Sequence, residues 1–169
     1  PLPPGSPKEG VCNYPEAQEA AILGGQTYVN IHTAANPTGE IRGQILVQSG
    51  MLMEAQLDGG QEVPPVATPA TGRAFVLVDT VANQLDYWIF HEGLTAPETA
   101  AHIHGYAPPG VNAGVKNPLA LGGTKVGTWN YPAADEFDIL NGLAYINVHT
   151  SAFPAGEIRG QIVRCTCFQ

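Results

Sequence analysis

Charged residues are scarce in this 169-residue chain, at 13% of the total, and basic residues are the scarcer kind. Seven Lys and Arg against 15 Asp and Glu give a formal net charge of −8. This argues against nucleic-acid binding, which needs clustered basic side chains to neutralise phosphates. No apolar run reaches the length of a membrane-spanning helix, so no membrane span is expected. No apolar signal segment is present and the chain begins at Pro1, which indicates a processed protein or a fragment.

Cysteine is also rare, with three residues close to the two ends of the chain: Cys12, Cys165 and Cys167. Three thiols at these spacings do not form a thiolate metal site. We expect a disulfide from Cys12 to Cys165 or Cys167, with the third thiol free or paired with another chain. Such a bridge is typical of an oxidising compartment, extracellular or periplasmic.

Turn-forming residues are abundant, with 20 Gly and 15 Pro, and they separate short runs rich in β-branched and aromatic residues. Short strands at this spacing predict an all-β sandwich or barrel. The expected strands are 52–57, 73–80, 84–92, 100–105, 126–130, 144–150 and 157–164, with a long loop over 106–124 and a single helical turn at 137–140.

An internal repeat decides the organisation of the chain. Residues 22–33 and 37–45 return as residues 139–150 and 154–162, with roughly two-thirds of the aligned positions identical. Only the end of the repeated unit is duplicated. We therefore expect a Pro-rich arm over 1–19, a partial repeat of two strands over 20–49, and one complete unit over 50–169.

Histidines supply the candidate site. In Ala101-His102-Ile103-His104-Gly105 the two histidines share one strand face and Ile103 the other, because side chains alternate along a strand. The strand 144–150 alternates in the same way and directs His149 away from the core. Three imidazoles from two strands form a site with an open coordination position, which suits copper or zinc.

The other polar candidates carry less weight. His91 could be a fourth ligand, but it is better interpreted as a half-buried residue at a strand end. Glu157 and Arg159, like Glu40 and Arg42 of the partial repeat, lie two apart on one strand. We expect both pairs to be structural charges on an exposed sheet face. Gln61–Pro65 is expected to form a rigid loop. Ser, Asp and His show no nucleophilic arrangement, so no catalytic residue is assigned.

Residues 51–169 resemble a complete chordin-type (CHRD) domain. The resemblance rests on Leu57-Asp58-Gly59-Gly60-Gln61-Glu62-Val63-Pro64-Pro65, on Ala101–Gly105, and on Asn147-Val148-His149-Thr150 with Gly156–Ile162. Residues 20–48 resemble the last two strands of a second such domain. In chordin-like proteins these domains occur as repeats in secreted, multi-domain chains.

The same order of motifs is more distantly similar to copper-zinc superoxide dismutase. That resemblance implies an immunoglobulin-like Greek-key sandwich with His102, His104 and His149 at the positions of three copper ligands. The loop 105–126 contains no histidine, so the bridging histidine and the zinc ligands of the dismutase are missing. Arg159 matches a structural position of the dismutase better than its active-site arginine.

Three functions are consistent with these observations. The first, which we favour, is a non-enzymatic extracellular module that binds copper, or another transition metal such as zinc, in a larger assembly. The others are a copper enzyme of the superoxide dismutase kind and a structural or recognition module without metal. The partial repeat is expected to pair with another copy of the chain or with the missing front of its own repeat, where His32 would complete a second metal site. The alternative is that it folds back onto the complete unit.

Overall fold

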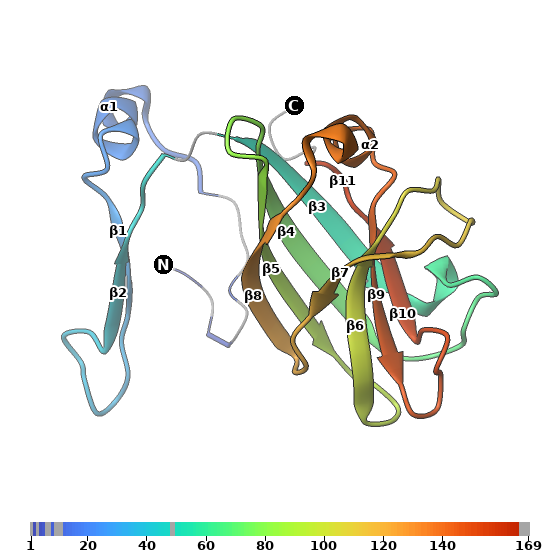
Figure 1. Cartoon of the computed structure of the whole chain (residues 1–169). Coiled ribbons are helices and arrows are strands. Elements are labelled where there is room, and N and C mark those ends of the chain that lie inside the picture. The colour runs from blue at the N-terminus through green and yellow to red at the C-terminus, as the bar shows by residue number, and fades with distance from the viewer. Residues whose placement is uncertain (1, 3, 6–7, 9–11, 48–49, 166–169) are drawn as a thin grey trace. The chain divides into compact units, whose positions relative to one another are not determined.

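Antiparallel strands make up most of the complete unit (Figure 1), and the alternating pattern predicts such strands. The structure is a computed structural model, and it describes residues 2, 4–5, 8, 12–47 and 50–165. The chain divides into two compact units, Pro1–Ser49 and Gly50–Gln169. The strands of the second unit are β3 (Met51–Asp58), β4 (Thr71–Asp79), β5 (Gln84–Glu92), β6 (Glu98–His104), β7 (Val115–Leu119), β8 (Thr124–Asn130), β9 (Tyr145–Thr150), β10 (Ile158–Gln161) and β11 (Val163–Arg164).

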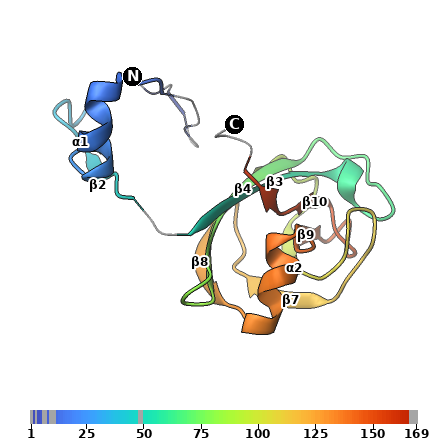
Figure 2. The ribbon, with the colours of Figure 1, turned by 90° about the horizontal axis from the view of Figure 1, so that it is seen from above.

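The strands follow one another in the order β7-β6-β9-β10-β3-β4-β5-β8, and β11 pairs with β3. The sheet curls on itself so that its strands surround a common interior (Figure 2). The fold is therefore all-β and intermediate between a sandwich and a barrel, which confirms the predicted class. Its helical elements are short: η2 (Gly59–Gln61), η3 (Ala133–Asp135) and α2 (Glu136–Leu140). In the described part of the chain, no helix has the length and apolar character needed to cross a bilayer.

Alternation along the strands creates the core. Ala74, Val76 and Val78 of β4 are fully buried, and they belong to one apolar cluster with residues from β3, β5, β6, β9 and β10. Ile139 of α2 is also part of this cluster, so the short helix covers one end of the interior. Each fully buried valine, leucine or isoleucine side chain contributes about 1.5–3 kcal/mol relative to an exposed one.

Most predicted strands are present within a few residues, and β5 has the predicted bounds. The expected loop over 106–124, however, contains β7. Its sequence, Val115-Lys116-Asn117-Pro118-Leu119, argues against a central strand because proline cannot donate to a ladder. β7 lies at one end of the sheet and pairs only with β6, and an edge is where a strand tolerates proline.

The N-terminal unit contains the short helical turns η1 (Glu16–Gln18) and α1 (Glu19–Leu23), followed by β1 (Tyr28–Ile31) and β2 (Ile41–Gln44). β1 and β2 form an antiparallel two-stranded sheet of their own. η1 falls inside the segment expected to be an arm. The same order of a 3-10 turn, a five-residue helix and two strands occurs in η3, α2, β9 and β10. The repeat therefore extends back to Asn13-Tyr14-Pro15, which matches Asn130-Tyr131-Pro132.

Equivalent residues of the two copies differ greatly in exposure. Ile158 of β10 is fully buried, whereas its counterpart Ile41 of β2 is 65% exposed. Tyr145 of β9 is 1% exposed and Tyr28 of β1 is 49% exposed. The same local sequence thus folds into the same hairpin, but the partial copy has none of the covering strands among the described residues.

This contrast provides a matched pair of substitutions. Ile158→Ala should lower the free energy of unfolding of the complete unit by about 2–5 kcal/mol, because it removes buried methylenes and leaves a cavity. Ile41→Ala should change it by no more than about 0.5 kcal/mol. Urea unfolding followed through Trp88 and Trp129, which both lie in the complete unit, measures the difference. Equal costs at the two positions would contradict the burial described above.

Candidate metal centre

β6 and β9 lie side by side and bring three predicted ligands together. His102 pairs with Asn147 across the ladder and Ala100 pairs with His149, so the two histidines are diagonal neighbours. Ile103, which points to the other face of β6, is fully buried in the core. The candidate ligand atoms of His102, His104 and His149 all lie within 4.8 Å of one another.

Two of these ring nitrogens are especially close. His102 Nδ1 lies 3.2 Å from His149 Nε2, and the two ring centroids are 5.0 Å apart. Two nitrogens bound to one ion at about 2.0–2.1 Å have a spacing of this order. Without an ion, the same contact is a hydrogen bond between the two rings, with one nitrogen protonated.

Backbone carbonyl groups orient two of the rings. Nδ1 of His149 lies 3.0 Å from the carbonyl oxygen of Pro154, and Nδ1 of His104 lies 3.0 Å from that of Ala113. A neutral ring that donates from Nδ1 presents Nε2 as a lone pair, which is the usual outer-shell arrangement around metal-binding histidines. Nε2 of His104 is buried and has no hydrogen-bond partner. The donor set and the orphaned nitrogen therefore fit a transition-metal ion.

Burial favours the neutral form of two of the candidate ligands, which is the form that can bind a metal. It lowers the pKa of His104, and the nearby His102, His149 and Arg159 lower it further, while the hydrogen bond to Ala113 opposes them. Burial and the neighbouring His149 likewise lower the pKa of His102. Both rings are therefore neutral at pH 7, where protons do not compete with a metal ion.

A stacked column of side chains supports His104. Its ring lies parallel to that of Tyr145, with centroids 5.0 Å apart, and the guanidinium of Arg159 lies 3.6 Å above the opposite side of the Tyr145 ring. The Tyr145 hydroxyl accepts from the backbone N–H of Ala113 at 2.9 Å and donates to its carbonyl oxygen at 3.2 Å. Ala113 thereby links the tyrosine to the carbonyl that orients His104.

The face that carries the histidines is covered, which corrects the expectation of an exposed sheet face. Arg159 is 1% exposed because the loop 105–114 lies over it: Nη2 donates to the carbonyl oxygen of Val111 and Nη1 to Oδ1 of Asn112. His104 is itself 9% exposed. The alternating pattern identified this face correctly, but it gave no information about the loops above it.

Glu157 was also wrongly expected to be a surface charge. It is fully buried, and one carboxylate oxygen accepts from the Thr68 hydroxyl and from both the backbone N–H and the hydroxyl of Thr95. The other oxygen accepts from the Thr150 hydroxyl. Burial alone would raise the pKa of this carboxyl, but these hydrogen bonds lower it overall. Glu157 therefore joins two loops to the end of β9.

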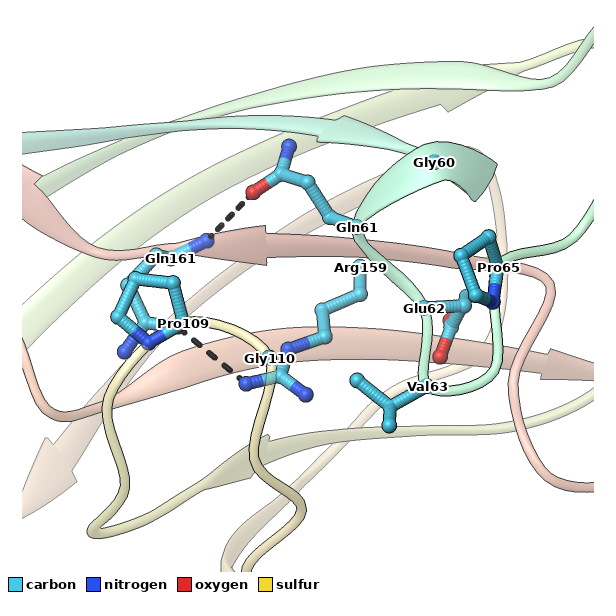
Figure 3. A pocket seen from close by; sticks show the side chains of 9 residues that line it. All are labelled: Gly60, Gln61, Glu62, Val63, Pro65, Pro109, Gly110, Arg159 and Gln161. Atoms are coloured by element: carbon cyan, nitrogen blue, oxygen red, sulfur yellow. Dashed lines mark hydrogen bonds between the residues drawn. The ribbon is translucent and has the colours of Figure 1, made fainter.

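A pocket of about 400 Å³ lies beside this column (Figure 3). Gly60 and residues of the Gln61–Pro65 loop form one wall, Pro109 and Gly110 the other, and Arg159 and Gln161 of β10 the floor. The floor is held by internal hydrogen bonds: Gln161 donates from its backbone N–H to Gln61, and Arg159 donates to the Gln161 amide oxygen. The motif predicted to be a rigid loop is thus part of the cover over the histidine-bearing face.

Glu62 stands out in this wall. It is 5% exposed, its Oε2 accepts from the Asn147 side chain at 3.3 Å, and its Oε1 has no partner. Burial raises its pKa to about 7, although Arg159 and the bond from Asn147 oppose the shift. Sequence analysis missed this residue. Its partner Asn147 recurs as Asn30 in the partial repeat, and that identity of a polar residue in both copies was the available signal.

The remaining predicted site residues lie elsewhere. His91 of β5 does not belong to the three-histidine cluster. Its Nε2 lies 3.4 Å from Oε2 of Glu98. Oε1 of Glu98 in turn lies 2.6 Å from Nζ of Lys125 on β8. This buried group connects β6 to β5 and β8. Burial and the charge of Lys125 lower the pKa of His91, against the opposing influence of Glu98. The surroundings of His91 therefore indicate a role in holding these strands together.

The prediction of a disulfide from Cys12 is wrong, because Cys12 is a free, exposed thiol in the structure. Its two predicted partners are at the far end of the chain, where Cys165 closes the described part and Cys167 lies outside it. His32 follows β1 in the N-terminal unit and is exposed.

These features define an antiparallel β module with a three-histidine cluster, preceded by a partial copy of its own last strands. The chain belongs to the CHRD domain family, whose family model matches residues 3–45 and 53–162. This confirms the predicted membership. The similarity to copper-zinc superoxide dismutase stays a prediction, since no solved structure matches the chain.

The chain is similar to two proteins named Chordin. It is 35% identical to that of Danio rerio over 171 residues, which cover 90% of this chain and 18% of the relative. It is 33% identical to that of Xenopus laevis over 160 residues, which cover 83% of this chain and 17% of the relative. The chain thus spans less than a fifth of the length of either relative.

The raised pKa of Glu62 predicts a pH dependence of stability. The unfolded carboxyl titrates near 4.5 and the folded one near 7, so folding takes up a proton between these values. The stabilisation is fully present below pH 4.5 and is lost as the pH rises through about 7. The Glu62→Gln substitution keeps the size and shape of the protonated side chain but removes its titration. Between pH 5 and pH 8 the wild type should therefore lose on the order of 2 kcal/mol of unfolding free energy relative to this variant.

Urea unfolding of both proteins at several pH values measures this difference. Glu92→Gln, at an exposed position at the end of β5, is the matched control and should leave the pH profile of the wild type unchanged. Parallel profiles for the wild type and Glu62→Gln would show that Glu62 is ionised in the folded protein at neutral pH.

Proposed function

We propose that this chain is a non-enzymatic extracellular CHRD module that binds one copper ion through His102, His104 and His149. We propose further that it assembles with another polypeptide through β1 and β2. The observation that carries the metal proposal is that one ring nitrogen from each of the three histidines lies within 4.8 Å of the others, with two of the rings oriented by carbonyl groups. Surface histidines without a ligand role do not need such outer-shell partners.

Copper is favoured by the chemistry of the donor set. Neutral imidazole suits both copper and zinc, but the affinity of a nitrogen site for divalent first-row metals is highest for Cu²⁺. The resemblance to copper ligands of a dismutase supports the same choice. Zinc is the alternative ion, because three imidazoles with one open position are also a known zinc arrangement.

Several features favour binding over catalysis. The three histidines provide for one ion only, and the loop 105–126 contains no histidine for a second. The net charge of −8 disfavours the approach of an anion such as superoxide. An extracellular location is supported by the resemblance to chordin-like proteins, in which such domains occur in secreted chains.

Removing a ligand should remove the metal. His102→Gln and His149→Gln should each weaken copper binding by more than about 100-fold, since even outer-shell substitutions cost about 10–100-fold. His91→Gln, which lies in the Glu98 group, is the matched control and should bind as the wild type does. His104 is a poorer choice because its ring also stacks on that of Tyr145, so its loss would disturb the column of side chains beside the site.

The measurement is a competition titration of chelator-stripped protein against a chromophoric copper ligand, with elemental analysis of the loaded protein. Copper should also raise the thermal midpoint of the wild type, because a ligand that binds only the folded state stabilises it. A wild type that retains no copper against a weak competitor would overturn the proposal.

Copper-loaded protein should show no superoxide dismutase activity beyond that of copper-free protein and of free copper at the same concentration. The physical reason is that the loop 105–126 contains neither a bridging histidine nor histidine ligands for a second metal. A stopped-flow superoxide decay assay on the loaded wild type and on His149→Gln tests this. Fast turnover that disappears in His149→Gln would establish the enzymatic alternative instead.

A further inference from the structure

The N-terminal unit reproduces the outer-face contacts of the complete unit without any covering strands among the described residues. Arg42 lies 3.6 Å above the ring of Tyr28, the same distance as Arg159 above Tyr145. The Gln44 side chain donates to the carbonyl oxygen of Gly25 at 2.6 Å, as that of Gln161 donates to Gly142 at 2.7 Å. The hairpin therefore has the geometry of a CHRD sheet segment by itself.

His32 is held in the same way as His149. Its Nδ1 lies 3.0 Å from the carbonyl oxygen of Pro37, five residues further along the chain. The corresponding contact from His149 to Pro154 has the same length and the same spacing. The ring of His32 is thus oriented by its outer-shell partner, and its Nε2 is left as a lone pair.

The apolar side of the hairpin is uncovered. Val29, Ile41 and Ile45 are 38%, 65% and 42% exposed, whereas their counterparts Ile146, Ile158 and Ile162 are all fully buried. In the complete unit these counterparts are covered by the interior that β3, β4 and β5 provide. An isolated two-stranded hairpin is marginal in water, and its open edges pair readily with further strands.

We propose that His32 is the third ligand of a second copper site, which forms when the front strands of another CHRD unit close on β1 and β2. This rests on the proposed function, because the second site is expected to use the chemistry of the first. The occupant is a polypeptide equivalent to residues 51–130, with an H-x-H strand of its own. The complete unit of this chain is not available for the role, since its β6 and β3 already pair with β9 and β10.

The complete unit also specifies the register. His102 pairs with Asn147 and His104 with Tyr145 on the β6 side of β9. The incoming strand should therefore run antiparallel to β1, with its first histidine opposite Asn30 and its second opposite Tyr28. This places both new histidines next to His32 in the same diagonal arrangement.

A chimaera of the full chain tests whether the hairpin can complete such a site. Five substitutions turn residues 145–162 into the sequence of residues 28–45: Ile146→Val, Val148→Ile, Ser151→Ala, Phe153→Asn and Ala155→Thr. The two core changes exchange one methylene and conserve the total volume, and such swaps are well tolerated. The other three lie in the loop between β9 and β10.

The chimaera should fold and bind one copper ion with an affinity within about tenfold of the wild type, since a misplaced outer shell costs about 10–100-fold. Adding His149→Gln to the chimaera should abolish the binding. A folded chimaera without copper binding would overturn the inference, and so would a chimaera that fails to fold. A wild type that does not bind copper would instead overturn the proposed function.

The identity of the occupant has its own test. The copper-loaded wild type and His32→Gln should have the same mass in solution by light scattering, and each should bind one copper ion per chain. A dimer of the wild type that His32→Gln dissociates would make a second copy of this chain the occupant, and would overturn the assignment to another CHRD front.

Discussion

The charge of Arg159 is the constraint on which the histidine-bearing face depends. A guanidinium that is 1% exposed must have hydrogen-bond acceptors, because a buried charge without partners is strongly destabilising. Besides the Gln161 amide oxygen, its acceptors come from Val111 and Asn112, so the loop 105–114 has to lie over the sheet. Ala113, the next residue, then contacts both Tyr145 and His104. The orientation of His104 on β6 thus follows from the desolvation of a charge on β10, with β9 between the two strands.

Residues 28–45 and 145–162 show how far local sequence determines structure. Both copies form the same hairpin and the same two contacts. In each, an arginine lies over a tyrosine ring, and a histidine Nδ1 lies near a proline carbonyl oxygen. Local sequence therefore specifies the geometry of this hairpin. The burial of Ile158 and the exposure of Ile41 are set by the strands around them, which the hairpin sequence does not contain.

The same distinction explains what could be predicted. Strand alternation located β5 and β9 and placed the three histidines on one face, because side-chain direction follows from position along a strand. It could not show that Glu157 and Arg159 are buried, since their cover comes from loops distant in sequence. His91 has the right residue type, but only the folded sheet shows that it lies with Glu98 and Lys125. Pro118 led to the prediction of a loop where β7 lies, because the rule that proline breaks strands does not hold at an edge.

The pairing of β3 with β11 has a mechanical consequence. Val163 pairs with Glu54 and Arg164 with Met53, and the backbone N–H of Cys165 donates to the carbonyl oxygen of Leu52. The first and last strands of the described part of the unit are therefore antiparallel, so the start of β3 and the finish of β11 lie at the same end of one ladder. Tension between its two ends would pull this ladder open one hydrogen bond at a time, instead of loading all its bonds together in shear. A module attached in this way yields first at β11 and leaves β9, with His149, until later.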